Sequence, residues 1–141
     1  MPATAEARRA ILCVDDEAVI LLALGQELRR RFGDRFSIET ALGASQAFAA
    51  IERLEAEGID VAIVVCDWYM PRMQGDEFLA KLRAQRPQIK SVLMTGQADK
   101  AAIARAKEAA GITACVTKPW RPELLARAIE ECLECALKPL P

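Results

Sequence analysis

The sequence predicts an α/β fold, a doubly wound parallel sheet of five strands with helices on both faces. Five short apolar runs alternate with five longer segments whose apolar residues recur at helical spacing. Most of these runs are continuously apolar, which is typical of parallel strands that are buried on both faces. Because parallel crossovers are right-handed, successive helices come to lie on both sides of one sheet. The length of 141 residues fits one such domain.

The first half of the chain contains two predicted strands and two predicted helices. Residues 10–14 form a buried strand, and residues 17–31 carry leucines at helical spacing before a basic end and a stop at Gly33. Residues 37–41 alternate between apolar and polar and predict a shorter, edge-like strand. Ser45 is placed to cap the second helix, because its hydroxyl can accept a hydrogen bond from a free main-chain N–H.

The second half of the chain continues the same alternation. We predict strands and helices over residues 61–66, 75–86, 89–94, 99–110, 112–117 and from 122 onward. Residues 61–66 are the most continuously apolar strand. The helix over 99–110, with Asp99 as its cap, has Ile103 as its only large apolar side chain. We therefore expect this helix to be the least firmly packed of the five.

The composition argues against several classes of function. Lysine and arginine total 19 against 20 aspartate and glutamate, a net charge of −1, so nothing global recruits nucleic acid or an anionic membrane. No apolar run has the length of a membrane span, and residues 1–9 lack the apolar stretch of a secretory signal. We expect one domain over residues 10–137, between an N-terminal tail and a C-terminal tail or linker start at residues 138–141.

Five cysteines without an export signal indicate a reducing cytoplasm. Cys13, Cys66 and Cys115 lie inside apolar runs, where a thiol acts as a small apolar side chain. Cys132 and Cys135 form a C-x-x-C pair within a helical pattern, but the chain has no histidine and no second pair to complete a metal site. Packing is therefore favoured over a redox or metal role for this pair.

Polar side chains follow four of the predicted strands. Asp15 and Asp16 end the first strand, Asp67 the third, Thr95 the fourth and Lys118 the fifth. Because ligands bind beyond the carboxyl ends of the strands in such sheets, we expect these five residues to form one site. Taken singly, the acids could cap a helix or lie in a loop, the threonine could belong to a turn, and the lysine could be solvated. Their joint order along the chain favours the site.

Three converging carboxylates repel one another and are usually stabilised by a cation. Oxygen ligands without histidine or thiolate favour a hard ion, and few protein ligands favour Mg²⁺ over Ca²⁺. A carboxylate beside Mg²⁺ suits phosphoryl transfer, with Asp67 as the nucleophile and an aspartyl phosphate as the product. Lys118 supplies a positive charge for the phosphoryl oxygens, and the Thr95 hydroxyl can donate a hydrogen bond to them.

These residues resemble the signature of receiver domains of two-component response regulators. The matching elements are Asp15-Asp16, Asp67-x-x-Met70-Pro71 with Gly75, Thr95-Gly96 and Lys118-Pro119. The resemblance extends over residues 10–137 and implies a flavodoxin-like sandwich with strand order 2-1-3-4-5. It also implies a signalling switch that is phosphorylated by a sensor histidine kinase or a histidine phosphotransfer protein. Such a domain catalyses only its own phosphorylation and dephosphorylation.

The resemblance implies a role for each acidic residue. Asp67 is the expected phosphoacceptor. Asp16 and Asp67 are expected to bind Mg²⁺ directly and Asp15 through a metal-bound water, with the main-chain carbonyl of Tyr69 as a further ligand. Lys118 is expected to pair with the phosphoryl group once it is in place.

The expected switch begins at Thr95, whose hydroxyl moves toward the phosphoryl group in relatives. They usually carry an aromatic residue three positions before the lysine, and this residue turns inward with that movement. Cys115 occupies the position here and has too little side chain to report the movement. The helix over 99–110 can still move directly with the Thr95 loop. The resemblance also implies a cis peptide bond between Lys118 and Pro119.

Aromatic side chains surround the expected site. Trp68 is expected to be partly exposed at the pocket rim, where it could shield the acyl phosphate or contact a kinase. Tyr69 and Gln97 occupy positions that the family ties to the hydrolysis rate, and a bulky Tyr69 is expected to hinder the attacking water. Trp120 could pack on the Lys118 loop or offer an exposed docking ring.

The expected output surface is the exposed face of the helix over 99–110, the last strand and the last helix. A downstream output domain or protein could use it, a homodimer is left open, and no direct contact with nucleic acid or membrane is expected. One rival is a receiver-like interaction module that does not switch by phosphorylation, although such modules usually lose the acceptor, an acid or the lysine. A haloacid dehalogenase-type phosphatase is disfavoured, because it needs an aspartate where this chain has Tyr69.

Overall fold

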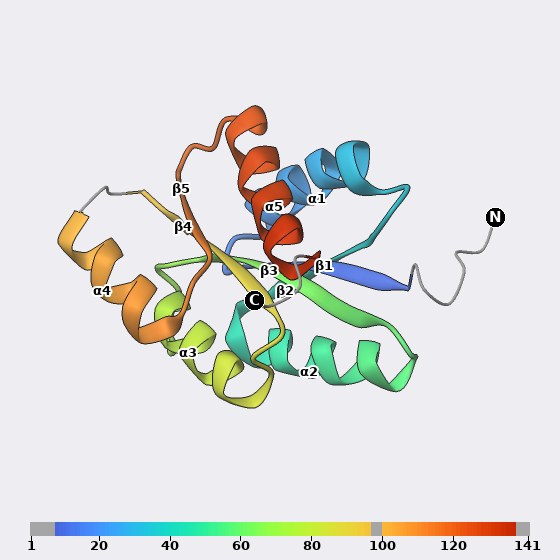
Figure 1. The fold of residues 1–141 in the computed structure, drawn as a ribbon, viewed down its shortest axis with the longest axis horizontal. Helices are drawn as coiled ribbons and strands as arrows, with labels where there is room; N and C mark the ends of the chain where they lie inside the picture. Colours follow the sequence, from blue (N-terminus) through green and yellow to red (C-terminus); the bar gives the residue numbers. More distant parts are fainter. Residues whose placement is uncertain (1–7, 97–99, 138–141) are drawn as a thin grey trace.

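Five strands and five helices alternate in the computed structural model, which describes residues 8–96 and 100–137. The strands are β1 (Arg9–Asp15), β2 (Ser37–Leu42), β3 (Asp60–Asp67), β4 (Lys90–Thr95) and β5 (Ala114–Thr117). The helices are α1 (Ala18–Phe32), α2 (Gly43–Ala56), α3 (Gly75–Gln85), α4 (Lys100–Ala110) and α5 (Pro122–Leu137). The strands form one sheet in the order β2-β1-β3-β4-β5, and each neighbouring pair is parallel (Figure 1). The predicted fold and strand order are therefore confirmed.

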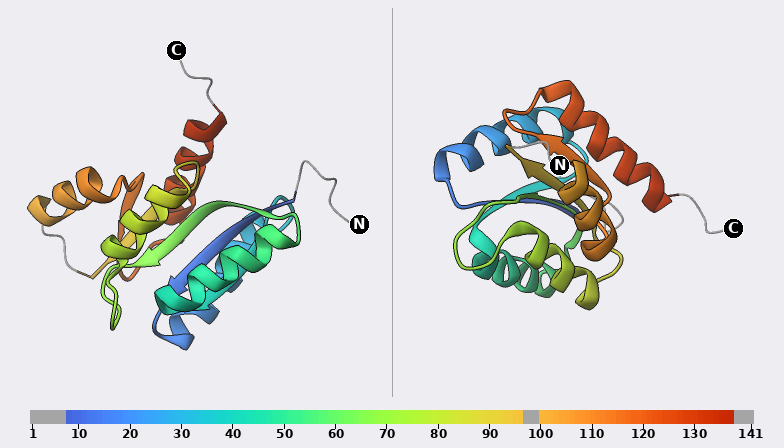
Figure 2. Two further views of the ribbon diagram at one scale, coloured as in Figure 1. Left: turned by 90° about the horizontal axis from the view of Figure 1, so that it is seen from below. Right: turned by 90° about the vertical axis from the view of Figure 1, so that its left-hand side faces the viewer.

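Helices cover both faces of the sheet, with α1 and α5 on one face and α2, α3 and α4 on the other (Figure 1, Figure 2). Strand β1 shows how side-chain alternation builds the two cores. Leu12 and Val14 pack on the α2 and α3 side, whereas Ile11 and Cys13 pack on the α1 and α5 side. All four side chains are fully buried. Packing from both sides therefore fixes the position of the strand end that leads into the site.

Most predicted boundaries agree with the structure to within one or two residues. The predicted cap at Ser45 is wrong, because α2 already begins at Gly43, with Leu42 at the N-cap position. Gly43 has a φ of 80°, a conformation that glycine adopts readily and that turns the chain directly from β2 into α2. Strand β5 begins two residues later than predicted. Asp99, the predicted cap of α4, and Gln97 lie outside the described residues.

Helix α4 buries fewer side chains than the other four helices, as its composition predicts. Ala106 and Ala110 are its two buried residues, and Ile103 is only partly buried. The helix packs mainly against α3 rather than against the sheet. Because few contacts hold α4, it is the helix whose displacement breaks the fewest interactions.

The structure also bears on what the composition predicts about the cysteines and about membrane spans. Cys13, Cys66 and Cys115 are free thiols. Cys132 lies on α5 and is fully buried in the core, in keeping with the packing role that was favoured for it. No helix in the described ranges is long and apolar enough to cross a bilayer.

Candidate functional site

The carboxyl ends of the strands bring the predicted residues to one edge of the sheet. Asp15 is the last residue of β1, Asp67 of β3 and Thr95 of β4. Lys118 directly follows β5, and its main-chain N–H donates a hydrogen bond of 2.7 Å to the carbonyl of Thr95. The peptide bond between Lys118 and Pro119 is cis, as the resemblance implies. The sheet therefore gathers side chains that are up to 103 positions apart in sequence.

Asp15, Asp16 and Asp67 form a compact acidic cluster, in which one carboxylate oxygen from each residue lies within 4.8 Å of the others. Asp15 is completely buried, Asp67 is 6% exposed and Asp16 is exposed. Asp15 also accepts a 3.0 Å hydrogen bond from the main-chain N–H of Glu17, so it steadies the entry to α1 as well as belonging to the cluster. Burial raises the pKa of Asp67; the hydrogen bond from Lys118 opposes this shift, and the charge of Asp15 adds to it.

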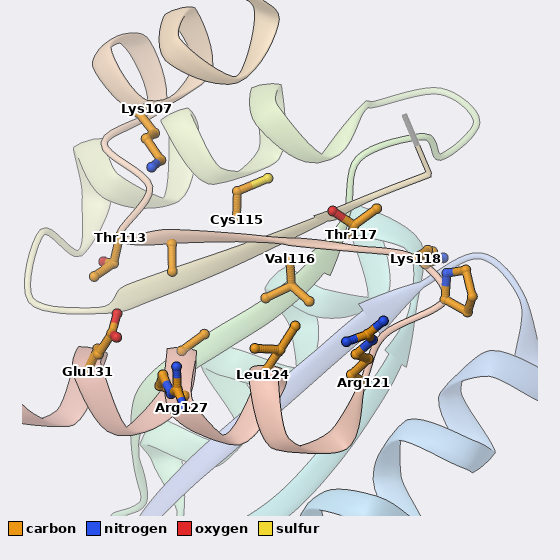
Figure 3. A pocket seen from close by; sticks show the side chains of 13 residues that line it. Lys107, Thr113, Cys115, Val116, Thr117, Lys118, Arg121, Leu124, Arg127 and Glu131 are labelled. Carbon is orange, nitrogen blue, oxygen red and sulfur yellow. The ribbon is translucent and has the colours of Figure 1, made fainter. Parts of the chain in front are cut away.

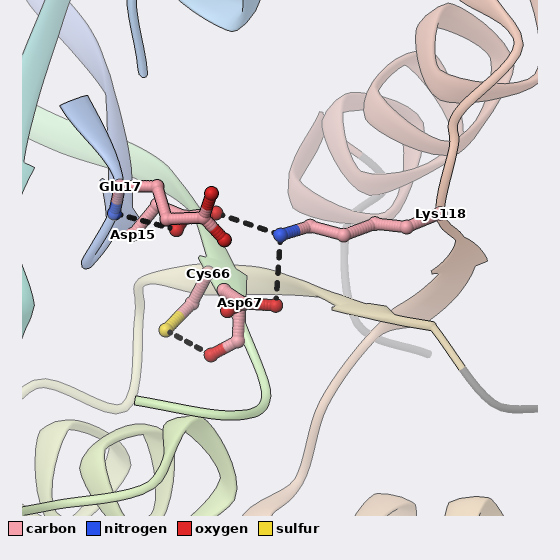
Figure 4. Close-up of polar contacts among 5 residues, drawn as sticks. All are labelled: Asp15, Glu17, Cys66, Asp67 and Lys118. Carbon is pink, nitrogen blue, oxygen red and sulfur yellow. Dashed lines mark hydrogen bonds and ion pairs between the residues drawn. The ribbon is translucent and has the colours of Figure 1, made fainter. Parts of the chain in front are cut away.

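Lys118 is the counter-charge of the cluster. Its Nζ lies 2.8 Å from Asp15 Oδ2 and 3.0 Å from Asp67 Oδ1 (Figure 4). Burial by itself would lower the pKa of Lys118, but hydrogen bonds to the two carboxylates outweigh it and raise that pKa. Three carboxylates and one ammonium leave a net charge of −2. This charge and the all-oxygen donor set fit a hard divalent cation such as Mg²⁺.

The main chain around Asp67 is fixed by close contacts with neighbouring segments. The N–H of Trp68 donates to the carbonyl of Met94 at 2.9 Å, and the N–H of Gly75 donates to the carbonyl of Trp68 at 2.7 Å. A Cβ atom on Gly75 would collide with the main-chain carbonyl oxygen of Asp67. The glycine of the predicted motif is therefore required because two main chains approach each other closely at this point.

One contact at the site has no signal in the sequence. The thiol of Cys66 donates a hydrogen bond of 3.3 Å to the main-chain carbonyl of Asp67 (Figure 4). Burial raises the pKa of Cys66 well above its usual value, and the nearby charges of Asp67 and Asp15 raise it further. The group therefore stays protonated and remains a donor. The sequence predicts only a small apolar side chain at this position.

One of the aromatic residues at this edge, Trp68, differs from the prediction. Trp68 is only 8% exposed, so its expected position at the pocket rim is wrong. It continues the alternation of Val64 and Cys66 onto the same core face and therefore packs beneath α2, α3 and α4. Tyr69 is instead 54% exposed and stacks on Trp68, with ring centroids 6.1 Å apart. Trp120 is partly buried against the α1 and α5 core, which favours packing over docking.

A doubly wound sheet whose carboxyl edge carries an acidic cluster and a paired lysine defines a class of protein, the signalling domains with receiver architecture. The comparison with protein families agrees with this class. The response regulator receiver domain family matches residues 11–130, and the chain belongs to this family. The predicted function, a phosphorylatable receiver domain of two-component systems, is therefore confirmed at the level of the family.

Two relatives and one solved structure match this chain over most of its length. The hydrogenase transcriptional regulatory protein HoxA of Cupriavidus necator is 31% identical over 124 residues, which are 88% of this chain and 24% of HoxA. The chemotaxis protein CheY1 of Helicobacter pylori is 29% identical over 122 residues, 85% of this chain and 93% of CheY1. The solved signal receiver domain of an HD domain-containing protein from Pseudomonas fluorescens superposes with a TM-score of 0.78 at 32% identity, covering 92% of this chain and 97% of that domain.

Proposed function

We propose that Asp67 accepts a phosphoryl group from a sensor histidine kinase or a histidine phosphotransfer protein. The observation that carries the proposal is the placement of this carboxylate, which is almost buried, belongs to the acidic cluster and lies 3.0 Å from the Lys118 ammonium. Asp15 is completely enclosed, and Asp16 forms no ion pair with the residues in the described ranges. Of the three acids, Asp67 therefore combines access with a fixed orientation.

In the proposed step, a carboxylate oxygen of Asp67 attacks phosphorus, and the new P–O bond forms as the bond from phosphorus to the donor breaks. The electron pair of the broken bond leaves with the donor. The Lys118 ammonium pairs with the phosphoryl oxygens, and the Thr95 hydroxyl donates a hydrogen bond to them. Attack of water on phosphorus then breaks this P–O bond, which returns the free carboxylate and releases inorganic phosphate. In this proposal the domain acts on itself and on no other substrate.

The same acids are proposed to hold Mg²⁺. Asp16, Asp67 and the main-chain carbonyl of Tyr69 would be direct ligands, and Asp15 would act through a bound water. When bound, the ion would neutralise charge on the phosphoryl oxygens. The net charge of −2 in the cluster supports a divalent ion, because Lys118 offsets only one of three carboxylates.

Phosphorylation is proposed to bias the loop after Thr95 and helix α4, and the face formed by α4, β5 and α5 is the proposed output surface. A downstream output domain or protein would bind there. A cytoplasmic location is part of the proposal and is supported by the free thiols of Cys13, Cys66 and Cys115. The rival reading, a module that does not switch, is disfavoured because Asp67, Asp15, Asp16 and Lys118 are all in place.

Treatment with acetyl phosphate in the presence of Mg²⁺ tests the assignment of Asp67. The Asp67→Asn variant is expected to lose all incorporation of the phosphoryl group, measured by intact-protein mass spectrometry, because an amide is not a nucleophile at this site. Asp60→Asn is the matched control, since Asp60 is an exposed aspartate at the opposite end of β3. Full incorporation into the Asp67→Asn variant would overturn the assignment.

A further inference from the structure

A hollow of about 700 Å³ lies at the carboxyl edge of the sheet, beside the acidic cluster. Three connections surround it: Asp16 follows β1, Gly43 lies where β2 passes into α2, and Arg72 lies between β3 and α3. A Cβ atom on Gly43 would meet no other atom within 4 Å, so the space next to this turn is open. Hollows of this size with a largely apolar lining are typical of sites for small organic molecules.

Most of the lining is apolar. Ala44, Phe48 and Met73 pack on the same core, on the α2 and α3 side of the sheet. The ring of Phe48 lies edge-to-face against the buried ring of Phe78, with centroids 4.9 Å apart, so its position is set from within the core. The apolar part of the lining is completed by Leu42 and Pro71. An aromatic ring can bury apolar surface here.

Arg72 is the cation of the hollow, and a strained turn sets its position. Its φ is 72°, and the N–H of Met73 donates a 2.8 Å hydrogen bond to the carbonyl of Pro71 across it. Arg72 is therefore the central residue of a γ-turn with positive φ, a rare and strained conformation for any residue other than glycine. Strain of this kind persists where the surrounding structure imposes it, and it is concentrated at ligand sites.

The charge that the hollow leaves free is positive. Arg72 is exposed and forms no ion pair with a residue in the ranges 8–96 and 100–137. Asp16 is the single acid in the lining, and it belongs to the acidic cluster, which already has Lys118 as its counter-charge. An anionic group is therefore attracted to the guanidinium of Arg72 and kept away from the Asp16 side.

We propose that this hollow binds a small aromatic anion. Its ring packs over Ala44, Phe48 and Met73, and its carboxylate, sulfonate or phosphate group pairs with Arg72. The inference goes beyond the proposed function, because this binding requires neither a phosphoryl group on Asp67 nor Mg²⁺. The occupant lies beside the acidic cluster and shares only the Asp16 wall with it.

The probe is naphthalene monosulfonate, added to the isotope-labelled domain without Mg²⁺ and without a phosphoryl donor. Binding is followed by the shifts of main-chain amide signals in two-dimensional NMR spectra. Saturable binding with a Kd of about 1 mM or lower is expected for a ligand of this size. The largest shifts are expected for the amides of Gly43, Ala44, Phe48, Arg72 and Met73. An absence of saturable binding up to about 10 mM would overturn the proposal.

Two control ligands separate the ring from the charge. Naphthylmethylammonium keeps the ring and reverses the charge, whereas methanesulfonate keeps the charge and lacks the ring. Each is expected to bind at least about tenfold more weakly than naphthalene monosulfonate, because it loses one of the two contacts. Equal binding of either control ligand would contradict the proposed chemistry.

A second hollow, along β5 and α5, provides an internal comparison (Figure 3). Its lining contains four basic residues, Lys107, Lys118, Arg121 and Arg127, against one in the hollow beside Asp16. A probe attracted by positive charge alone would therefore shift the amides of β5 and α5 most. Largest shifts in that region would overturn the proposal.

A substitution at Arg72 tests the cation. Arg72→Asn removes the charge, and asparagine tolerates the left-handed conformation of this turn. The variant is expected to bind naphthalene monosulfonate at least about fivefold more weakly. Arg127→Asn is the matched control with no expected change, because Arg127 is an exposed arginine of the second hollow (Figure 3). Undiminished binding by a folded Arg72→Asn domain, as judged by a thermal melt, contradicts the proposal.

An added acid tests the hollow from its α2 side. Ser45 is exposed and lines the hollow, so Ser45→Glu should repel the probe and weaken its binding at least about threefold. Ala49→Glu adds the same charge at an exposed position of the same helix outside the lining, and it should leave binding unchanged. Equal effects of the two variants would assign the change to net charge and would overturn the proposal. Self-association that Ser45→Glu abolishes would identify a second copy as the occupant, with the same consequence.

This inference and the assignment of Asp67 fail in different measurements. Loss of the Asp67 assignment appears as phosphoryl incorporation into Asp67→Asn, which involves no naphthalene ligand. Loss of the present inference appears as probe binding that ignores the ring, the charge or Arg72, in the unphosphorylated domain.

Discussion

Strands β1 and β3 are packed far more completely than strand β5, and the difference separates the part of the domain that we propose to accept the phosphoryl group from the part that we propose to respond. Every residue of β1 after Arg9 is buried, as is every residue of β3 from Ile63 onward. Strand β5 has four residues, of which Val116 alone is buried, and the neighbouring α4 buries two alanines. The acids that end β1 and β3 are therefore held in fixed positions, while β5 and α4 can move with little loss of packing.

Lys118 connects these two parts. Its side chain contacts Asp15 and Asp67, and its main-chain N–H is bonded to Thr95 at the end of β4. Under the proposed function, a phosphoryl group on Asp67 would change the charge that this ammonium faces, and the segment that follows β5 would respond first. We infer that β5 and α4 can respond through this route without an aromatic ring at Cys115.

The contrast in packing predicts the largest effect of a single substitution. Ile51→Ala in α2 removes a fully buried side chain and should lower the free energy of unfolding by about 3 kcal/mol, because it leaves a cavity in the core. Ile103→Ala in α4 removes a partly buried side chain and should cost about 1 kcal/mol. Urea denaturation of the two variants measures the difference. Similar losses would show that α4 is packed as firmly as α2.

A substitution at the connection should have a smaller effect on stability. Lys118→Ala leaves Asp15 and Asp67 without their counter-charge and should lower the free energy of unfolding by about 2 kcal/mol. This value is smaller than for a fully buried pair, because the lysine side chain is 18% exposed to solvent. Added Mg²⁺ is expected to recover part of the loss. A variant as stable as the unmodified protein without Mg²⁺ would show that the ion pairs contribute nothing.

The effect of Lys118→Ala should also depend on pH. Burial already raises the pKa of Asp67, and removing the ammonium raises it further. A carboxyl group with a raised pKa binds its proton more tightly in the folded chain, so its contribution to stability falls as the pH rises above about 4, the unfolded value. The variant should therefore differ least from the unmodified protein near pH 4 and most near about pH 7. Urea denaturation across this range checks the sign, and a loss that does not change with pH would exclude the acids as its cause.

The sequence allowed the fold and the clustering of the site to be predicted, because both follow from where the strands end. An apolar run followed at once by Asp15 or Asp67 places the carboxylate at the carboxyl edge of a parallel sheet, whatever the rest of the packing does. The pairing of Lys118 with both acids follows from the same rule, since β5 ends at that edge.

The features that the sequence did not reveal depend on geometry beyond the strand ends. Trp68 is buried because the alternation of β3 continues one residue past Asp67, and the sequence pattern alone does not show where the alternation stops. The start of α2 depends on the positive φ of Gly43 rather than on the capping potential of Ser45. The hydrogen bond from Cys66 depends on a main-chain carbonyl, whose direction is set by the loop that follows.

The smallest expected effect concerns the rate at which the proposed phosphoryl group on Asp67 is hydrolysed. Tyr69 is half exposed and stacks on the buried Trp68, which steadies its ring two positions after Asp67. A ring held beside an aspartyl phosphate restricts the approach of water, so Tyr69→Ala should speed dephosphorylation about fivefold, or about 1 kcal/mol in the barrier. Tyr69→Phe keeps the stacked ring and should keep the slow rate. The decay of incorporated phosphoryl group after removal of acetyl phosphate distinguishes the variants. An unchanged rate in Tyr69→Ala would mean that this ring does not restrict the approach of water to the phosphoryl group.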